Sequence, residues 1–327
     1  MAEEVLKNIY RCEIPLPKNP LRSVNSYFIR GRERDLIVDT GMNRDECMRA
    51  MQFCLEELKV DLNKTDFFIT HLHVDHLGLL SSLVGERSVV YFNQPDSERL
   101  RSSTRWNEMI NFTLVNGFPE DELRTILNYH PAYQYGLKKD VSFTILKEGD
   151  TITVGDYHFR CVETPGHSAG HMCLYEPNER ILLSGDHILK DITPTIQLRS
   201  DGENPLKDYL ASLQKIDRLE IEIVLPGHRS VFDSCKERIC ELEQHHQERS
   251  EEIVLILEKG CQNAYQVASQ MTWDISSASW DLFPVMQKWF ATGEAIAHLK
   301  YLEETGRVRR EPREQKTVFC LSGKSSL

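Results

Sequence analysis

The segment from Thr70 to Gly78 constrains this chain more than any other stretch. It places three histidines and one aspartate within six residues, as His71, His73, Asp75 and His76. The apolar run 67–69 before it predicts a short buried strand, because its residues are aromatic or β-branched. Neutral imidazole and carboxylate groups are good ligands for divalent transition metals, so the segment predicts a metal site at the end of that strand.

Four further motifs place a histidine or an aspartate after an expected strand. They are Asp39-Thr40-Gly41, Thr164-Pro165-Gly166-His167, Leu183-Ser184-Gly185-Asp186 and Leu225-Pro226-Gly227-His228. Alone, each motif indicates only a turn, since Gly and Pro beside a polar residue are typical of turns. Together with the histidine cluster, they resemble the metal-binding motifs of the metallo-β-lactamase superfamily. The resemblance covers about residues 10–235.

The resemblance implies a site for two divalent metal ions, with zinc as the first expectation and manganese or iron as alternatives. The implied ligands form two groups that share Asp186 as a bridge: His71, His73 and His167 for one ion, and Asp75, His76 and His228 for the other. Asp39 is expected to hydrogen-bond to ligands and to fix their orientation. His187, next to Asp186, is expected to support the site without binding metal.

The expected chemistry is hydrolysis by a hydroxide that bridges the two metal ions. A water shared between two cations loses a proton near neutral pH, so no Ser or Cys nucleophile is required. Asp75 is the expected catalytic residue, because it can orient the hydroxide and shuttle its proton. The sequence does not identify substrate-binding residues, although Asn25 and Tyr27 are expected on a strand that faces the site.

Hydrophobic periodicity predicts the elements of the first half of the chain. Paired strands are expected at residues 23–29 and 36–38, and Asn43 or Asp45 is expected to cap the helix that follows. After the histidine cluster, a further helix is expected to begin near Leu77. The alternation of strands and helices favours an α/β fold.

The second half of the chain is expected to begin with another series of strands. The series starts with residues 141–146 and includes a hairpin turn at Gly155-Asp156. Later segments predict helices at 236–257 and 293–305, followed by a β-ribbon within residues 307–321. No internal repeat is evident in the sequence.

The implied fold is a four-layer αββα sandwich, in which two sheets pack face to face with helices outside. We expect residues 1–235 to form the catalytic domain, with an inserted helical cap at about residues 93–140 that covers the site. Residues 236–327 are expected to form a small C-terminal domain that resembles a winged helix. This arrangement is similar to the lactamase-beta-2-like and glyoxalase-II-like types of the superfamily.

Composition limits the cell compartment and the partners. The chain has 327 residues, a formal net charge of -11 and nine scattered cysteines. The scattered cysteines predict reduced thiols, not a disulfide framework. The first residues contain no apolar leader segment, and no stretch approaches the length that spans a bilayer. We therefore expect a cytoplasmic protein that binds no membrane, and the sequence leaves a homodimer open.

Three functions stay open at this stage. The first is hydrolysis of a small-molecule ester, thioester or lactone. The alternative is cleavage of single-stranded RNA by an endonuclease, which the overall acidity disfavours but which a basic run in the tail could serve. That run contains Arg307, Arg309, Arg310, Arg313 and Lys316. The third is a non-enzymatic metal sensor or partner-binding protein, which the complete set of ligand-type residues disfavours.

Overall fold

The computed structural model describes residues 1–129, 131–198, 200–274 and 279–323. The chain divides into two compact units. We call the first the sheet unit; it comprises Met1–Arg101, Pro131–Pro194 and Ser212–Ile239. We call the second the helical unit; it comprises Ser102–His130, Thr195–Ala211 and Cys240–Leu327.

The first sheet of the sheet unit has seven strands in the order of the chain. They are β1 (Glu3–Leu6), β2 (Ile9–Pro15), β3 (Ser23–Ile29), β4 (Asp35–Val38), β5 (Thr65–Phe68), β6 (Val90–Asn93) and β7 (Thr144–Leu146). The strands from β1 to β4 pair antiparallel, and those from β4 to β7 pair parallel. The predicted pairing of residues 23–29 with 36–38 is confirmed, with Tyr27 opposite Val38.

The second sheet has five strands in the order β12-β11-β10-β9-β8. They are β8 (Thr151–Val154), β9 (Tyr157–Glu163), β10 (Met172–Glu176), β11 (Ile181–Gly185) and β12 (Ile223–Pro226). The predicted hairpin between β8 and β9 is confirmed, and its Gly155 has a φ of +59°, which glycine adopts without strain.

The structure corrects the assignment of residues 141–146 to the second series of strands. Strand β7 pairs parallel with β6, so it forms the edge of the first sheet. Periodicity reports which side of a strand is buried, but it does not report which neighbour supplies the hydrogen bonds. Here the open edge of β6 supplies them, with Tyr91 opposite Thr144.

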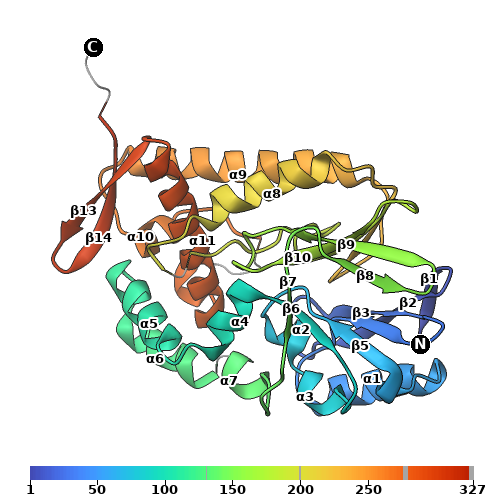
Figure 1. The fold of residues 1–327 in the computed structure, drawn as a ribbon. Coiled ribbons are helices and arrows are strands. Elements are labelled where there is room, and N and C mark those ends of the chain that lie inside the picture. The colour runs from blue at the N-terminus through green and yellow to red at the C-terminus, as the bar shows by residue number, and fades with distance from the viewer. Residues whose placement is uncertain (130, 199, 275–278, 324–327) are drawn as a thin grey trace. The chain divides into compact units, whose positions relative to one another are not determined.

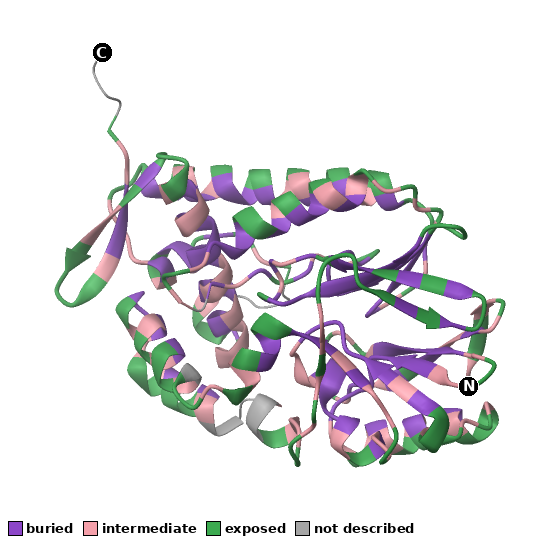
Figure 2. Cartoon of the chain, in the orientation of Figure 1, coloured by how far each residue is buried: buried purple, intermediate pink, exposed green. Residues whose placement is uncertain are grey.

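The two sheets enclose one apolar core (Figures 1 and 2). Its buried side chains alternate along the strands, as expected where one face of each strand is covered. The first sheet contributes Tyr27, Ile29 and Phe68 among others, and the second contributes Phe159, Leu174 and Leu183 among others.

Within the sheet unit, helical segments lie on the outer face of each sheet, as the predicted αββα layers require (Figure 1). The first sheet packs a second apolar core against α1 (Asp45–Glu57), α2 (Val74–Leu77) and α3 (Leu80–Leu83). On the second sheet, the Ser212 hydroxyl of α8 (Pro205–Asp217) donates to the carbonyl of Pro165 over 2.9 Å. The predicted α/β fold class is confirmed.

Two helix starts differ from the prediction. Arg44, not Asn43 or Asp45, occupies the N-cap of α1, and its side chain makes no capping hydrogen bond. Helix α2 begins at Val74 with His73 at the N-cap, so Asp75 and His76 lie inside the helix. The helix therefore begins three residues before the predicted Leu77. The apolar pattern could not reveal this start, because two polar residues occupy the first turn.

The predicted helical insertion contains four helices among the described residues, and they divide between the two units. Helices α4 (Gln94–Arg101) and α7 (Pro131–Tyr135) belong to the sheet unit. Helices α5 (Arg105–Val115) and α6 (Glu120–Tyr129) belong to the helical unit, where their apolar residues pack around Trp289. The predicted domain boundary at residue 235 stays a prediction.

The rest of the helical unit matches most of the expected elements. It contains the main part of α9 (Cys235–Leu257), then α10 (Ala264–Ala268), α11 (Val285–Glu304), β13 (Val308–Arg313) and β14 (Lys316–Leu321). Helix α11 starts eight residues before the predicted 293, directly after Pro284. Two short 3₁₀ helices complete the described elements, at Leu62–Lys64 and Trp280–Leu282.

The cysteine prediction requires a correction. Cys261, just before α10, and Cys320 on β14 form a disulfide, with their Cα atoms 4.3 Å apart. The other seven cysteines are free thiols. Spacing along the chain could not reveal this pair, because 59 residues separate the two cysteines.

No helix within the described residues combines the length and the apolar character that a membrane span requires. The expected cell compartment stays a prediction.

A mutation in the core between the sheets tests this packing. We expect Phe159→Ala to lower the free energy of unfolding by about 3–5 kcal/mol, because it removes a fully buried ring and leaves a cavity. Phe53→Ala is the matched control, since Phe53 is 52% exposed on α1 and its loss is expected to cost about 0.5 kcal/mol or less. Denaturant unfolding measures both, and equal effects would contradict the described core.

Thiol titration in denaturant tests the disulfide. We expect seven reactive thiols before reduction and nine after it. A Cys261→Ser variant is expected to show eight thiols without reduction, because Cys320 loses its partner. Nine thiols in the unreduced wild type would restore the original expectation.

Candidate metal centre

The predicted site residues follow the ends of strands that come from both sheets. Asp39 follows β4, the segment 71–76 follows β5, His167 follows β9, Asp186 follows β11 and His228 follows β12. All of them belong to the sheet unit. Within the described residues, their ligand atoms form three groups, each spanning at most 4.8 Å: His71, His73 and His167; His71, His76 and Asp186; and Asp75, His76 and His228.

The first group brings three imidazole rings together edge to face. Nδ1 of His73 lies 2.9 Å from Nε2 of His71 and 2.9 Å from Nε2 of His167. The three nitrogens therefore point toward one small volume. His71 and His73 both lie in the short bent segment that joins β5 to α2, and this segment carries their rings to the same volume.

The second group combines one carboxylate with two rings. Oδ2 of Asp75 lies 3.5 Å from Nε2 of His228 and 4.0 Å from Nε2 of His76. All three residues are buried. The early start of α2 produces this arrangement, since Asp75 and His76 project from its first turn.

Asp186 lies between the two groups. Its Oδ2 atom is 3.5 Å from Nε2 of His167, 3.5 Å from Nε2 of His76 and 3.4 Å from Nε2 of His228. A single carboxylate oxygen thus faces rings from both groups.

Several buried atoms of this cluster have no hydrogen-bond partner among the described residues. They are Oδ1 of Asp186 and the Nε2 atoms of His76 and His228. Buried polar atoms are normally satisfied, because leaving one unpaired costs free energy. Lone pairs of imidazole and carboxylate that converge in this manner suit a divalent cation, so the donor set fits the implied metal.

Asp39 orients one of the rings. Its backbone has a φ of +57°, a conformation that short polar side chains tolerate. Its Oδ2 accepts a hydrogen bond from Nδ1 of His76 over 2.7 Å, and its Oδ1 accepts one from the Thr70 backbone N–H over 2.9 Å. A proton held on Nδ1 leaves the Nε2 lone pair of His76 directed at the cluster.

Two other rings are oriented in the same way through Nδ1. Nδ1 of His228 lies 2.6 Å from the Ser23 carbonyl, which can only accept a hydrogen bond. Nδ1 of His71 lies 3.0 Å from the Thr70 hydroxyl, which also lies 2.9 Å from Oδ2 of Asp39. These contacts fix the tautomer in which the Nε2 lone pair can bind a metal.

The electrostatics of the cluster set a competition between protons and cations. Burial, followed by the neighbouring rings of His76 and His73, lowers the pKa of His71 well below its usual value. Burial also lowers the pKa of His228, but the carboxylates of Asp186 and Asp75 outweigh it and raise that pKa to about 10. A cation at Nε2 of His228 therefore has to displace a proton.

Glycines beside the ligands permit the close approach of the strand ends. A Cβ atom on Gly227 would lie 2.5 Å from Oδ1 of Asp186, which no side chain could tolerate. Gly185 has a φ of +48°, and its Cβ would lie 2.7 Å from Nε2 of His171. Gly185 and Gly227 therefore allow the close packing of the site in addition to forming the turns of their motifs.

His171 is a buried residue of the site that its sequence motif did not reveal. Its Nδ1 lies 2.8 Å from the Thr164 hydroxyl, and its Nε2 accepts a hydrogen bond from the Asp186 backbone N–H over 3.1 Å. His171 therefore fixes the backbone that carries Asp186. Its position four residues after His167 was a visible signal, but no spacing rule separated it from the many structural histidines.

Three other expected site residues support the scaffold. The ring of His187 packs against His171 with centroids 6.0 Å apart, and burial lowers its pKa to about 3. Asn25 donates hydrogen bonds to the carbonyls of Pro226 and Arg229, and the Tyr27 hydroxyl donates to that of Pro226. Both therefore hold the turn that presents His228.

The family model of the metallo-beta-lactamase superfamily matches residues 19–228. The chain belongs to this superfamily. A second model, of a metallo-beta-lactamase-like C-terminal domain, matches residues 259–319. The chain is therefore a hydrolase of the metal-dependent type, and its His and Asp clusters are suited to divalent metals.

Similar proteins agree with this assignment. A "Probable metallo-hydrolase YqjP" from Bacillus subtilis is 28% identical over 85% of this chain and 86% of its own length. The human "Acyl-coenzyme A thioesterase MBLAC2" is 29% identical over 64% of this chain and 74% of its own length. A crystal structure of a metallo-beta-lactamase family protein from Thermus thermophilus superposes with a TM-score of 0.82 at 27% identity, covering 97% of this chain and 99% of that one.

The contact between Asp39 and His76 yields a test of orientation. We expect Asp39→Asn to weaken binding of Zn²⁺ by about 10–100-fold. Both carboxylate oxygens of Asp39 accept hydrogen bonds, from Thr70 or His76, and the NH₂ group of asparagine would replace one of these acceptors with a donor. A competition titration with a chromophoric chelator measures the affinity. Asp156→Asn is the control, since its carboxylate lies in the β8–β9 turn and is 61% exposed. Equal affinity of Asp39→Asn and wild type would show that the contact does not orient the ring.

Proposed function

We propose that this chain is a dinuclear metal-dependent thioesterase that hydrolyses small acyl thioesters. The observation that carries the proposal is the position of Asp186, whose Oδ2 faces His167 of one group and both His76 and His228 of the other. The thioester substrate class rests on the similarity to a relative named as an acyl-coenzyme A thioesterase.

In this proposal, the chain holds two cations with the predicted ligands. The groups are His71, His73 and His167 for one cation, and Asp75, His76 and His228 for the other, with Asp186 shared. We propose zinc first, because the ligands mix imidazole and carboxylate, with manganese or iron as alternatives. When bound, such a pair of cations lowers the pKa of a shared water and polarises the substrate carbonyl.

Asp75 is proposed to move the proton as well as to hold metal. Burial raises the pKa of its carboxyl, but His76 and His228 outweigh this effect, and the pKa lies below its usual value. Asp75 is therefore ionised at neutral pH, and its Oδ2 can accept a proton from the attacking water and return it to the leaving thiolate. Asp39 and His171 hold His76 and Asp186 in place during this exchange.

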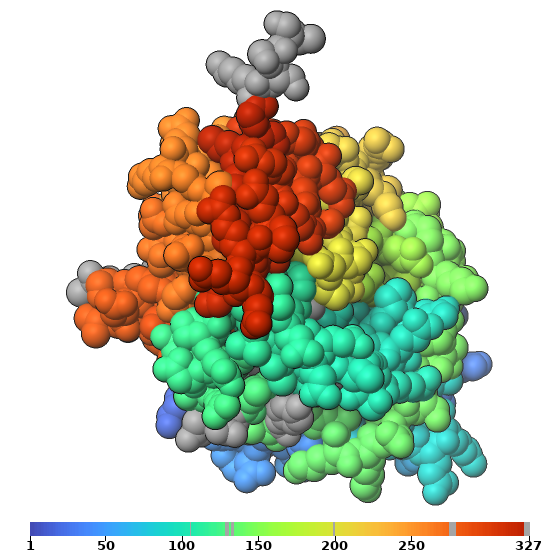
Figure 3. Space-filling model, turned by 90° about the vertical axis from the view of Figure 1, so that its left-hand side faces the viewer, coloured from blue at the N-terminus to red at the C-terminus, as the bar shows by residue number. Residues whose placement is uncertain are grey.

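The alternative of single-stranded RNA cleavage receives less support from the tail. Arg307 pairs with Glu251, and Arg310 pairs with Glu303 and Asp201. Arg309 and Arg313 both contact Glu311. The ribbon lies on the surface (Figure 3), yet carboxylates already neutralise these arginines, so the run lacks the excess positive charge that attracts a phosphate backbone.

A hydrolase panel tests the proposed function. We expect zinc-loaded protein to hydrolyse an acyl-coenzyme A thioester faster than the matching oxygen ester, a lactone or single-stranded RNA. Removal of metal by a chelator is expected to abolish turnover, and added Zn²⁺ to restore it. Asp75→Ala is expected to lower kcat by about 10²–10⁴-fold, because it removes the proton acceptor.

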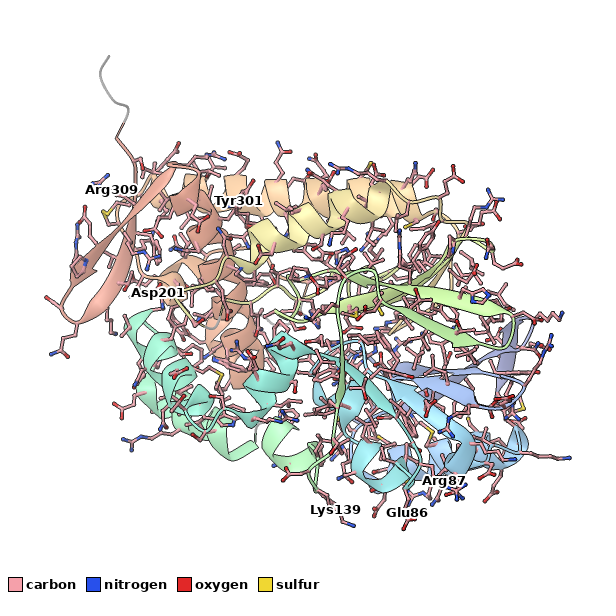
Figure 4. The ribbon with its side chains drawn as sticks, in the orientation of Figure 1. Glu86, Arg87, Lys139, Asp201, Tyr301 and Arg309 are labelled. Atoms are coloured by element: carbon pink, nitrogen blue, oxygen red, sulfur yellow. A yellow bond between two sulfur atoms is a disulfide. The ribbon has the colours of Figure 1, made fainter. Side chains whose placement is uncertain are left out.

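The control for Asp75→Ala is Glu86→Gln. Glu86 is an exposed carboxylate of the same unit, at its outer edge (Figure 4), so its loss is expected to leave kcat unchanged. Metal content is measured for each variant, which separates lost chemistry from lost metal. Protein that binds two equivalents of zinc and turns over none of the acyl substrates would overturn the proposal.

A further inference from the structure

A buried carboxylate outside the proposed ligand set connects two of the loops that carry its histidines. Asp96 lies in the first turn of α4 and is fully buried. Its Oδ2 accepts hydrogen bonds from the Leu72 backbone N–H over 2.9 Å and from the Ser168 hydroxyl over 2.7 Å. Its Oδ1 accepts one from the Gly170 backbone N–H over 3.0 Å.

Two of the three partners of Asp96 are immediate neighbours of histidines in the first group. Leu72 lies between His71 and His73, and Ser168 directly follows His167. One carboxylate thus ties the loop after β5 to the loop after β9. These two loops carry the whole of the first group, whose nitrogens approach one another to 2.9 Å.

The surrounding backbone is arranged for this contact. The Asn93 side chain accepts a hydrogen bond from the Asp96 backbone N–H over 2.8 Å, which fixes the start of α4. A Cβ atom on Gly170 would lie 1.6 Å from Oδ1 of Asn93, so only glycine allows the loop to reach Asp96. Burial raises the pKa of Asp96, and the three donors oppose that effect.

We propose that Asp96 is a positioning residue that sets the geometry of the first metal group by clamping its two loops together. This inference rests on the proposed two-cation site. An acidic residue in the first turn of a helix can serve only to stabilise the N-terminus of that helix. In that role, the side chain of Asp96 would accept hydrogen bonds from within α4. All three bonds accepted by the Asp96 side chain instead go to the histidine loops.

The variant Asp96→Asn tests the clamp. An amide has one acceptor oxygen, so in either orientation its NH₂ group faces at least one of the three donors. We expect one of the two bound Zn²⁺ ions to be held about 10–100-fold more weakly, with the other unchanged. We also expect the visible spectrum of the Co²⁺-loaded protein to change, because one coordination geometry is altered.

Two further variants make the test specific. Ser168→Ala removes one of the three donors and is expected to weaken the same Zn²⁺ ion by a smaller factor. Asp66→Asn is the matched control, since this largely buried carboxylate also accepts a backbone hydrogen bond, from Val89, and pairs with Arg34. We expect it to lower the melting temperature and to leave both Zn²⁺ affinities and the Co²⁺ spectrum unchanged.

The outcomes separate this inference from the proposed function. If wild-type protein fails to bind two Zn²⁺ ions, the proposed site and the role of Asp96 are both overturned. If wild type binds two and Asp96→Asn retains both affinities and the Co²⁺ spectrum, only the role of Asp96 is overturned. Should Asp96→Asn fail to fold, Ser168→Ala carries the same comparison with Asp66→Asn.

Discussion

The structure depends on the burial of one carboxylate, that of Asp186, among rings that come from separate strands. A buried carboxylate is stable only where opposite charge or donors compensate its lost hydration. Here the compensation comes from His76, His167 and His228, which lie 3.4 to 3.5 Å from its Oδ2. None of these rings is a sequence neighbour of Asp186, so the balance exists only when both sheets are assembled.

Around this centre, buried polar groups orient residues of the predicted metal site. Asp39 fixes His76, the carbonyl of Ser23 fixes His228, and His171 fixes the backbone of Asp186. Such supporting contacts matter because a metal ligand that is free to rotate loses affinity and geometry. Asp39 belongs to one of the motifs that the sequence revealed, whereas Ser23 and His171 lie outside them. The close packing they require also explains why the loops at these strand ends contain glycines that tolerate no Cβ atom.

The sequence pointed to the histidines and aspartates of the predicted site because their motifs are local. Each motif combines a short apolar strand, a turn and a polar residue. All three features are recognisable within a few positions of the sequence. His171 and Asp96 were missed because their partners lie on other segments: Asp96 bonds to Gly170, 74 positions away. The pair Cys261 and Cys320 was missed for the same reason. The partner of β7 could not be predicted either, since one strand pattern fits the edge of either sheet.

By itself, the sequence determined the α/β layers, the strand that leads into the histidine cluster, and the set of imidazoles and carboxylates able to bind metal. These follow from periodicity and residue chemistry, which act over short distances along the chain. Only the tertiary structure decided which atoms face one another, that Asp186 lies between the two groups, and that Asp96 joins two of the loops. Those contacts join strand ends that are distant in sequence, and no local property of the chain encodes their distances.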